Sequence, residues 1–262
     1  MKVQVTAAEV QRDFRRHQSC GDGIEDADDW MAPGGLVLAR LMAEQLAPKC
    51  GSRILDLGCG KGQSSVFLAA RYGVQVVSVD LWISPKERNA RAREAGVDTR
   101  ILALQGDIGR GLPQELGSFD SIFCLQAFHC FGTNPGTLRY LGSLLKPGGM
   151  LCFSQGCFRC EPGALPPLFQ DTGGWKADYN HYHSPDWWRD HVAASGLFDV
   201  LTAEEVEGGQ VLWEDDVLRR GDRAGWSNEF LENSQWLIRQ IAHGQTSSPT
   251  LTHCIVGAKR KA

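Results

Sequence analysis

Apolar and polar positions follow two alternating patterns along most of the chain. Short apolar runs typical of buried strands lie at residues 53–58, 74–80, 100–107, 119–128 and 150–156. Segments with helical character lie between them, at 64–73, 85–95 and 138–145. Strands that alternate with helices predict an α/β fold in which a parallel sheet is connected by right-handed crossovers.

The remaining segments follow other patterns. Residues 1–30 are polar, and a helix is expected at 36–46. Residues 157–183 are rich in glycine, proline and aromatic residues, which predicts a loop or lid. Ser184 is the expected N-cap of a helix at 186–195, with Pro185 at its first position. Segments 197–207 and 251–260 are expected to be the last two strands, with helices near 214–219 and 229–243 between them.

Composition narrows the class of protein. Lysine and arginine number 27 and aspartate and glutamate 31, and there is no long basic run, so nucleic acid is not an expected partner. Nothing approaches the ~18 consecutive apolar residues of a membrane span. No apolar run follows the first basic residues, so neither a membrane anchor nor a secretory signal is expected. The nine cysteines, spread over hydrophobic segments, favour reduced thiols and a cytoplasmic location.

The strongest chemical signal is the run Asp56-Leu57-Gly58-Cys59-Gly60-Lys61-Gly62, between a predicted strand and a predicted helix. Glycines there let the backbone approach a ligand, and the following helix N-terminus presents N–H groups. The spacing differs from the G-x-G-x-x-G turn of nicotinamide enzymes, and no phosphate-binding G-x-x-x-x-G-K-[ST] run is present. The carboxylate of Asp56 would suit an ammonium group and oppose a pyrophosphate. This loop therefore predicts a cofactor with an amino-acid end.

Two acids end the next predicted strands. Asp80 ends the strand at 74–80, and Asp107 ends the strand at 100–107. Ligands of open parallel sheets bind beyond the carboxyl ends of the strands, so the loop and both acids should converge on one crevice. Asp80 follows Gly62 by 18 positions, close to the ~20-residue offset of a ribose-binding acid.

Together with the block Leu145-Lys146-Pro147-Gly148-Gly149, these features resemble the class I S-adenosylmethionine-dependent methyltransferases. The matching blocks cover roughly residues 50–156, in the order found in the family. The resemblance implies a doubly wound, Rossmann-like sheet of seven strands, mostly parallel and closed by a C-terminal antiparallel hairpin. Pro33-Gly34-Gly35 and residues 183–188 are similar to a small-molecule branch, near the cyclopropane-synthase-like and quinone-biosynthesis-like enzymes.

The resemblance also implies roles for single residues. The three loop glycines would line the methionine end of S-adenosylmethionine, and Asp80 would hold the ribose hydroxyls. Asp107 and Ile108 would contact the adenine, and Gln126 would lie beside the sulfonium. The full set of expected cofactor-binding residues is Asp56, Gly58, Cys59, Gly60, Gly62, Asp80, Leu81, Asp107, Ile108 and Gln126.

The acceptor side is expected after the fourth predicted strand. His129 is the candidate general base or orienting group there, although a histidine among aromatic residues can also be a packing residue. Tyr179 and His181 are weaker candidates. The aromatic residues of 157–188 predict an apolar or aromatic acceptor beneath a lid. The segment after the fourth strand lacks an Asn/Asp-Pro-Pro-Tyr motif, which argues against amino-methylation of DNA bases.

We therefore expect one domain over residues 1–262: a helical extension at 1–50, a cofactor-binding core at 50–156, and a lid and acceptor region with the closing strands at 157–262. The expected activity is direct displacement of the methyl group onto a small molecule, in a protein that could be a homodimer.

Other interpretations stay open. They are a binding protein for S-adenosylmethionine without methyl transfer, a cyclase or cyclopropane-type enzyme that uses it, and a nicotinamide-dependent oxidoreductase. Cys157 and Cys160 form a C-x-x-C run with His181 and His183 downstream, but the spacing does not give the two close pairs of a zinc site. No metal is predicted.

Overall fold

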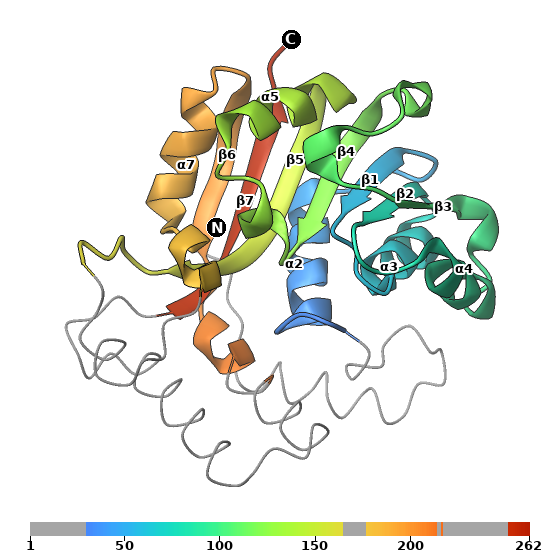
Figure 1. Ribbon diagram of the computed structural model, residues 1–262, viewed down its shortest axis with the longest axis horizontal. Helices are drawn as coiled ribbons and strands as arrows, with labels where there is room; N and C mark the ends of the chain where they lie inside the picture. Colours follow the sequence, from blue (N-terminus) through green and yellow to red (C-terminus); the bar gives the residue numbers. More distant parts are fainter. Residues whose placement is uncertain (1–29, 165–176, 214–215, 217–250) are drawn as a thin grey trace, which may run out of the picture.

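The computed structural model describes residues 30–164, 177–213, 216 and 251–262. These residues fold around one mixed β-sheet with the strand order β3-β2-β1-β4-β5-β7-β6 (Figure 1). In chain order the strands are β1 (Arg53–Leu57), β2 (Gln75–Asp80), β3 (Ile101–Gln105), β4 (Phe119–Leu125), β5 (Leu145–Phe158), β6 (Phe198–Glu205) and β7 (Leu251–Arg260).

Strand directions divide the sheet into two parts. From β3 to β5 each neighbouring pair is parallel, whereas β7 is inserted antiparallel between β5 and β6. The central strands are buried on both faces, which explains their continuous apolar runs. The predicted seven-stranded, mostly parallel sheet with a C-terminal antiparallel hairpin is therefore confirmed.

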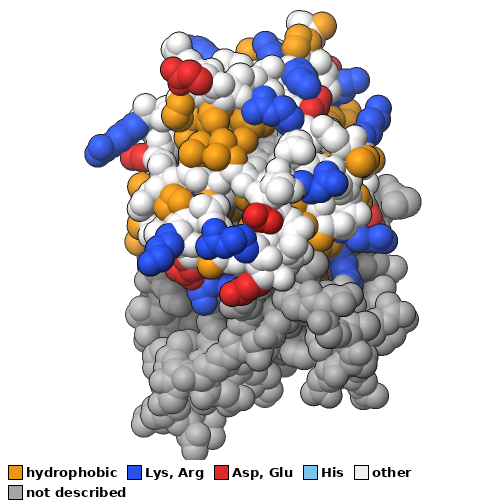
Figure 2. Space-filling model, turned by 90° about the vertical axis from the view of Figure 1, so that its right-hand side faces the viewer, with side chains coloured by type: hydrophobic (Ala, Val, Ile, Leu, Met, Phe, Trp, Pro, Cys, Tyr) orange, Lys and Arg blue, Asp and Glu red, His pale blue; other side chains and the backbone are white. Residues whose placement is uncertain are grey.

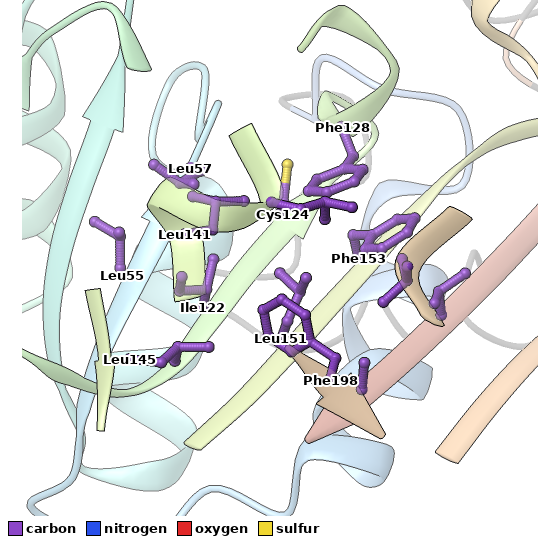
Figure 3. Close-up of a cluster of buried hydrophobic side chains, with 14 of the residues drawn as sticks. Leu55, Leu57, Ile122, Cys124, Phe128, Leu141, Leu145, Leu151, Phe153 and Phe198 are labelled. Carbon is purple, nitrogen blue, oxygen red and sulfur yellow. The ribbon is translucent and has the colours of Figure 1, made fainter. Parts of the chain in front are cut away.

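Helices cover both faces of the sheet (Figure 1). The helices are α2 (Gly35–Leu46), α3 (Gln63–Tyr72), α4 (Pro85–Glu94), α5 (Pro135–Leu144) and α7 (Pro185–Ala194). The first three share one hydrophobic cluster with one face of the sheet, which we name the α2 face. The other two pack on the opposite face, the α5 face, around the cluster drawn in Figure 3. None of the described helices is long and apolar enough to cross a membrane.

Three of the helices begin in the same way. Ser84, Asn134 and Ser184 accept hydrogen bonds from the backbone of the first turns of α4, α5 and α7, and a proline follows each cap. Proline has no N–H to leave unsatisfied at this position, and its fixed φ suits a helix start. The N-cap expected at Ser184 is confirmed, with Trp187 N donating to its Oγ at 3.2 Å.

Stacked aromatic rings attach the segment after β4 to the α5 face. The ring of Phe128 stacks on Phe153 of β5 at a centroid distance of 3.8 Å and meets Trp188 of α7 edge-on at 5.6 Å. Figure 3 shows Phe128 and Phe153 side by side in the core. Phe128 opens the short 3-10 turn η5 (Phe128–Cys130), so this stacking fixes the position of His129 on the surface of the core.

Several predicted boundaries are wrong. The fourth strand ends at Leu125 and not at 128, because Gln126 has a φ of 57°, a left-handed conformation that ends an extended strand. The turn expected at 146–149 is instead the start of β5, where the register with β4 shifts. The predicted loop at 157–183 contains the end of β5 and a 3-10 helix, η6 (Ala177–His181).

Other expectations lie largely outside the described residues. These are the polar segment at 1–30 and the helices near 214–219 and 229–243.

The β3 edge of the sheet is left partly uncovered. The connection from β3 to β4 contains two 3-10 turns, η3 (Ile108–Arg110) and η4 (Gln114–Leu116), in place of a crossover helix. Leu102 of β3 is consequently 50% exposed. Figure 2 views the molecule from this side and shows hydrophobic side chains gathered on its surface.

Candidate functional site

The glycine loop, residues 58–62, joins β1 to α3 at the carboxyl end of the sheet. Gly58, Gly60 and Gly62 have φ angles of 65°, 54° and 85°, which only glycine adopts without strain. The backbone N–H groups of Gly58 and Cys59 donate to Val79 O at 2.8 and 3.2 Å, which ties the loop to β2. Gly62 is the N-cap of α3 and supplies no capping side chain, so the first turn of this helix is suited to an anionic or polar ligand.

The loop also contacts the segment after β4. A Cβ on Gly58 would lie 2.4 Å from the Cβ of Ala127, so no other residue fits at this position. Ala127 stands between Gln126 and Phe128, where the acceptor side was expected. The structure therefore brings the predicted cofactor loop and the predicted acceptor segment into direct contact.

Asp80 binds the loop through its carboxylate. Its Oδ2 accepts a hydrogen bond from Gly60 N at 2.8 Å, and its Oδ1 accepts from Trp82 N and Ile83 N at 2.8 and 2.9 Å. The residue is only 6% exposed. Asp80 thus lies beside the glycine loop, and its first task is to fix the backbone of this loop. A carboxylate has lone pairs for one further donor beside these three.

Asp56 is directed into the protein and away from solvent. Its Oδ2 accepts hydrogen bonds from the hydroxyls of Ser64 and Ser65, each at 2.6 Å, in the first turn of α3. Its Oδ1 is buried and accepts no hydrogen bond from any described residue. Burial raises the pKa of Asp56 to about 6, although both serines act in the opposite direction. This unpartnered oxygen, beneath the glycine loop, is suited to a cationic donor such as an ammonium group.

Arg88 is a buried cation beneath the loop that the sequence pattern did not identify. It belongs to the charged helix α4 but is only 2% exposed. Its guanidinium donates to the carbonyls of Ser78 and Leu104 at 2.8 Å each and contacts Cys59 Sγ at 3.2 Å. The only signal in the sequence for the burial of Arg88 was its position on the face of α4 that packs on the sheet, in a helix that is otherwise polar.

Burial also decides the state of Cys59. It raises the pKa of the thiol to about 12, so Cys59 stays protonated and fills space beside the loop.

The predicted adenine side lies at the ends of β2 and β3. Leu81 is 47% exposed and the neighbouring Trp82 is 75% exposed. Asp107 accepts a hydrogen bond from Gly109 N at 2.8 Å and forms an ion pair with Arg110 at 3.5 Å. Ile108 follows in the same 3-10 turn and packs against the α5-face cluster. The exposed Trp82 was missed in the sequence because a single tryptophan after an acid forms no pattern.

Gln126 and His129 stand where β4 ends. Gln126 N donates to Ser154 O at 2.8 Å, and the Gln126 amide lies 3.5 Å from the Ser154 hydroxyl. His129 contacts the ring of Tyr182 edge-on at a centroid distance of 5.1 Å, and its Nε2 lies 3.4 Å from Cys130 Sγ. The predicted acceptor histidine therefore lies beside the aromatic segment that precedes α7.

A cleft lies directly on the glycine loop. It encloses about 350 Å³ including its open mouth. Trp30 and Met31 form one side, and Gly58 to Lys61 form the other together with Leu125.

The remaining candidates are less central. Tyr179 is buried against Phe158 and Tyr182, whereas His181 is exposed. Cys160 is exposed, but Cys157 is buried, and burial raises the pKa of its thiol well above the usual value. The described part of the chain contains no group of three or more residues arranged to hold a metal ion.

Known proteins are similar to this chain in sequence and in fold. Residues 54–149 match the family described as "Methyltransferase domain". The 27-O-demethylrifamycin SV methyltransferase of Amycolatopsis mediterranei is 30% identical over 125 residues, 47% of this chain and 46% of the relative. The ubiquinone biosynthesis O-methyltransferase of Xanthomonas euvesicatoria is 37% identical over 109 residues, 40% of this chain and 43% of the relative. The matched segments thus span less than half the length of these curated relatives.

The similarity of folds extends further along the chain. The crystal structure of a putative sarcosine dimethylglycine methyltransferase from Galdieria sulphuraria superposes with a TM-score of 0.67 at 18% identity. It covers 86% of this chain and 86% of that one. Residues 54–149 of the chain are thus similar to a methyltransferase domain, and the seven-stranded architecture is shared with a solved methyltransferase-like structure.

Proposed function

We propose that the protein transfers the methyl group of S-adenosylmethionine to a hydroxyl oxygen of a small, apolar or aromatic molecule. The observation that carries this proposal is the contact between Gly58 and Ala127, because it joins the cofactor loop to the acceptor segment at the carboxyl edge of the sheet. The two O-methyltransferases similar in sequence support oxygen as the methylated atom.

The residues around the glycine loop and at the ends of the neighbouring strands fit S-adenosylmethionine. The buried Asp56 Oδ1 has no donor among the described residues, and an amino-acid ammonium would provide one. Asp80 retains a lone pair for a ribose hydroxyl, and the exposed Leu81 and Trp82 offer apolar surface for the adenine. Asp107, Ile108 and Gln126 complete the proposed set. The bound cofactor supplies an electrophilic methyl group, so the protein itself does not have to activate the donor.

The work of the chain is to align the acceptor and to remove its proton. His129 is held by η5, whose first residue is locked into the core by ring stacking, so its imidazole has a fixed position beside Tyr182. In our proposal His129 accepts the proton of the attacking hydroxyl or orients it. The aromatic residues around it exclude water and align the acceptor for the displacement.

Two arguments favour a small acceptor. The described cleft is a small concave site lined by the glycine loop together with Trp30, Met31 and Leu125, which suits a metabolite and not a macromolecule. The net charge of −4 gives no electrostatic attraction toward nucleic acid. A cytoplasmic location, independence of membranes and assembly into a homodimer are further parts of the proposal.

Calorimetric titration with S-adenosylmethionine, S-adenosylhomocysteine and NADH tests the cofactor. Binding of both sulfur compounds without NADH supports the proposal, and binding of NADH alone contradicts it. Transfer of a radiolabelled methyl group to a panel of phenols then tests the reaction. Cofactor binding without transfer to any member of the panel would favour a protein that binds S-adenosylmethionine for another purpose.

A further inference from the structure

His253 on β7 is a buried histidine with only one of its ring nitrogens bonded. It is 0% exposed, and its Nδ1 lies 3.0 Å from Gly209 O. A carbonyl oxygen can only accept, so Nδ1 carries the proton and Nε2 presents a lone pair. Burial lowers the pKa of His253 to about 4, which keeps the ring neutral at neutral pH. No described residue donates a hydrogen bond to Nε2.

Packing alone does not explain a histidine at this position. Leu251 and Ile255 precede and follow His253 on the same face of β7, and both are buried aliphatic residues. An aliphatic side chain at 253 would fill the same face without the desolvation cost of a buried acceptor that lacks a donor. The bond from Nδ1 to Gly209 O accounts for one ring nitrogen, and the Nε2 lone pair can take a hydrogen bond from a donor that no described residue supplies.

His253 belongs to a row of aromatic rings, which we name the aromatic row: His129, Tyr182, Trp213 and His253. The His253 ring stacks on Trp213 at 4.9 Å, Trp213 lies 6.2 Å from Tyr182, and Tyr182 lies 5.1 Å from His129. Gly156 of β5, directly opposite His253, makes room for the row. A Cβ on Gly156 would lie 2.6 Å from the Tyr182 ring and 2.8 Å from the Trp213 ring.

The row begins at the point proposed for methyl transfer. Ser154, two residues before Gly156 on the same face of β5, accepts the hydrogen bond from Gln126 N. Two residues of a strand span about 7 Å, so Gly156 lies one side-chain step beyond Ser154. Ser154 is the residue that binds Gln126, which is proposed to lie beside the sulfonium. Gly209 follows β6, and β7 lies between β6 and β5. Because the Nδ1 of His253 is bonded to Gly209 O, the ring edge that carries Nε2 faces away from Gly209.

Resting on the methyl transfer proposed above, we propose that His253 Nε2 accepts a hydrogen bond from a hydroxyl group of the acceptor and so selects hydroxylated aromatic molecules. Tyr182 and Trp213 provide aromatic surface for the body of such a molecule. The hydroxyl that binds the neutral His253 ring keeps its proton, and the hydroxyl that is methylated is a different one, whose proton passes to His129. A site built to accept from a hydroxyl discriminates strongly against an analogue that lacks it.

The test compares phenol with toluene, which has the same shape but no donor. Wild-type protein is first saturated with S-adenosylhomocysteine and then titrated with each compound, while ¹⁵N-labelled histidine resonances are recorded. We expect phenol to shift the Nε2 resonance of His253. We also expect the phenol-to-toluene affinity ratio to fall about 10-fold in His253→Leu, equivalent to about 1.4 kcal/mol.

Two further variants serve as controls. His191→Leu removes a histidine whose Nε2 is already bonded to Gly132 O, on the α5 face, and should keep the wild-type ratio. His253→Gln restores an acceptor near the position of Nε2 and should recover part of the ratio, which a purely structural role would not produce. A wild-type ratio retained in His253→Leu, or no saturable phenol binding to the wild type, overturns the inference. Failure of S-adenosylhomocysteine to bind contradicts instead the proposed function.

Discussion

Replacing Asp80 by asparagine tests whether this acid holds the glycine loop. The carboxylate accepts three backbone hydrogen bonds, one from Gly60 on Oδ2 and two, from Trp82 and Ile83, on Oδ1. An asparagine can satisfy the pair on one oxygen, but its amide NH₂ then faces Gly60 N–H, donor against donor. Asp80→Asn therefore removes at least one hydrogen bond to a charged acceptor.

The magnitude follows from the number of bonds lost. A hydrogen bond to a charged group contributes about 1.5–3 kcal/mol, so Asp80→Asn should lower the free energy of unfolding by roughly 2 kcal/mol. Asp80→Ala loses all three bonds and should cost roughly 3–5 kcal/mol, less than three full contributions because Trp82 N and Ile83 N can gain water. Cofactor affinity should fall with the first variant, since Gly60 is released.

Urea denaturation followed by circular dichroism measures both effects, with the slope of the transition checked for constancy. Asp107→Asn is the matched control, because its carboxylate is 39% exposed and caps a short turn, so its loss should cost less than about 1 kcal/mol. If Asp80→Asn unfolds at the same urea concentration as the wild type or the control, Asp80 does not hold the loop.

Three further predictions use other residues. The pKa of Asp56 is raised to about 6 in the fold, so the folded state binds this proton more tightly and loses stability as pH rises from about 4 through 6. The difference in unfolding free energy between the wild type and Asp56→Asn should therefore change by roughly 3 kcal/mol between pH 4 and 7, and a constant difference would contradict the shift. His129→Ala should lower turnover in the methyl transfer assay at nearly unchanged calorimetric affinity for S-adenosylhomocysteine; unchanged turnover would remove His129 from the mechanism. Ser184→Ala should reduce stability by about 1 kcal/mol through the lost cap of α7, measured as a lower Tm.

Patterns that are local in sequence predicted most of the fold. The alternation of apolar strands and helices, the glycine turn and the Ser184–Pro185 helix start each depend on a few consecutive residues, and each was found. The end of β4 could not be predicted, because the run 119–128 stays apolar while one backbone angle at Gln126 ends the strand. The 146–149 segment contains typical turn residues, but pairing with β4 draws it into β5.

The position of the candidate site residues was predictable only where it depends on local sequence. The loop glycines, Asp80 and Asp107 all lie at strand ends, which the topology of a parallel sheet brings to one edge. Arg88 and His253 were missed for the same physical reason. Each looks ordinary in its own segment, a charged residue in a charged helix and a polar residue in a closing strand. Arg88 is buried by contacts with β2 and β3, and His253 is buried by contacts with Trp213 and Gly209. Of these partners, only β2 is close in sequence to the residue that it contacts.

The contact between Gly58 and Ala127 limits how the protein could be re-engineered. At 2.4 Å from a would-be Cβ, Ala127 leaves no room for a larger side chain on either partner. A larger side chain at 127, introduced to reshape the proposed acceptor site, would push against the glycine loop and is expected to weaken cofactor binding while it alters substrate choice. The two properties are inseparable at this position, so libraries aimed at new acceptors should vary the distant end of the aromatic row and leave residues 58 and 127 unchanged.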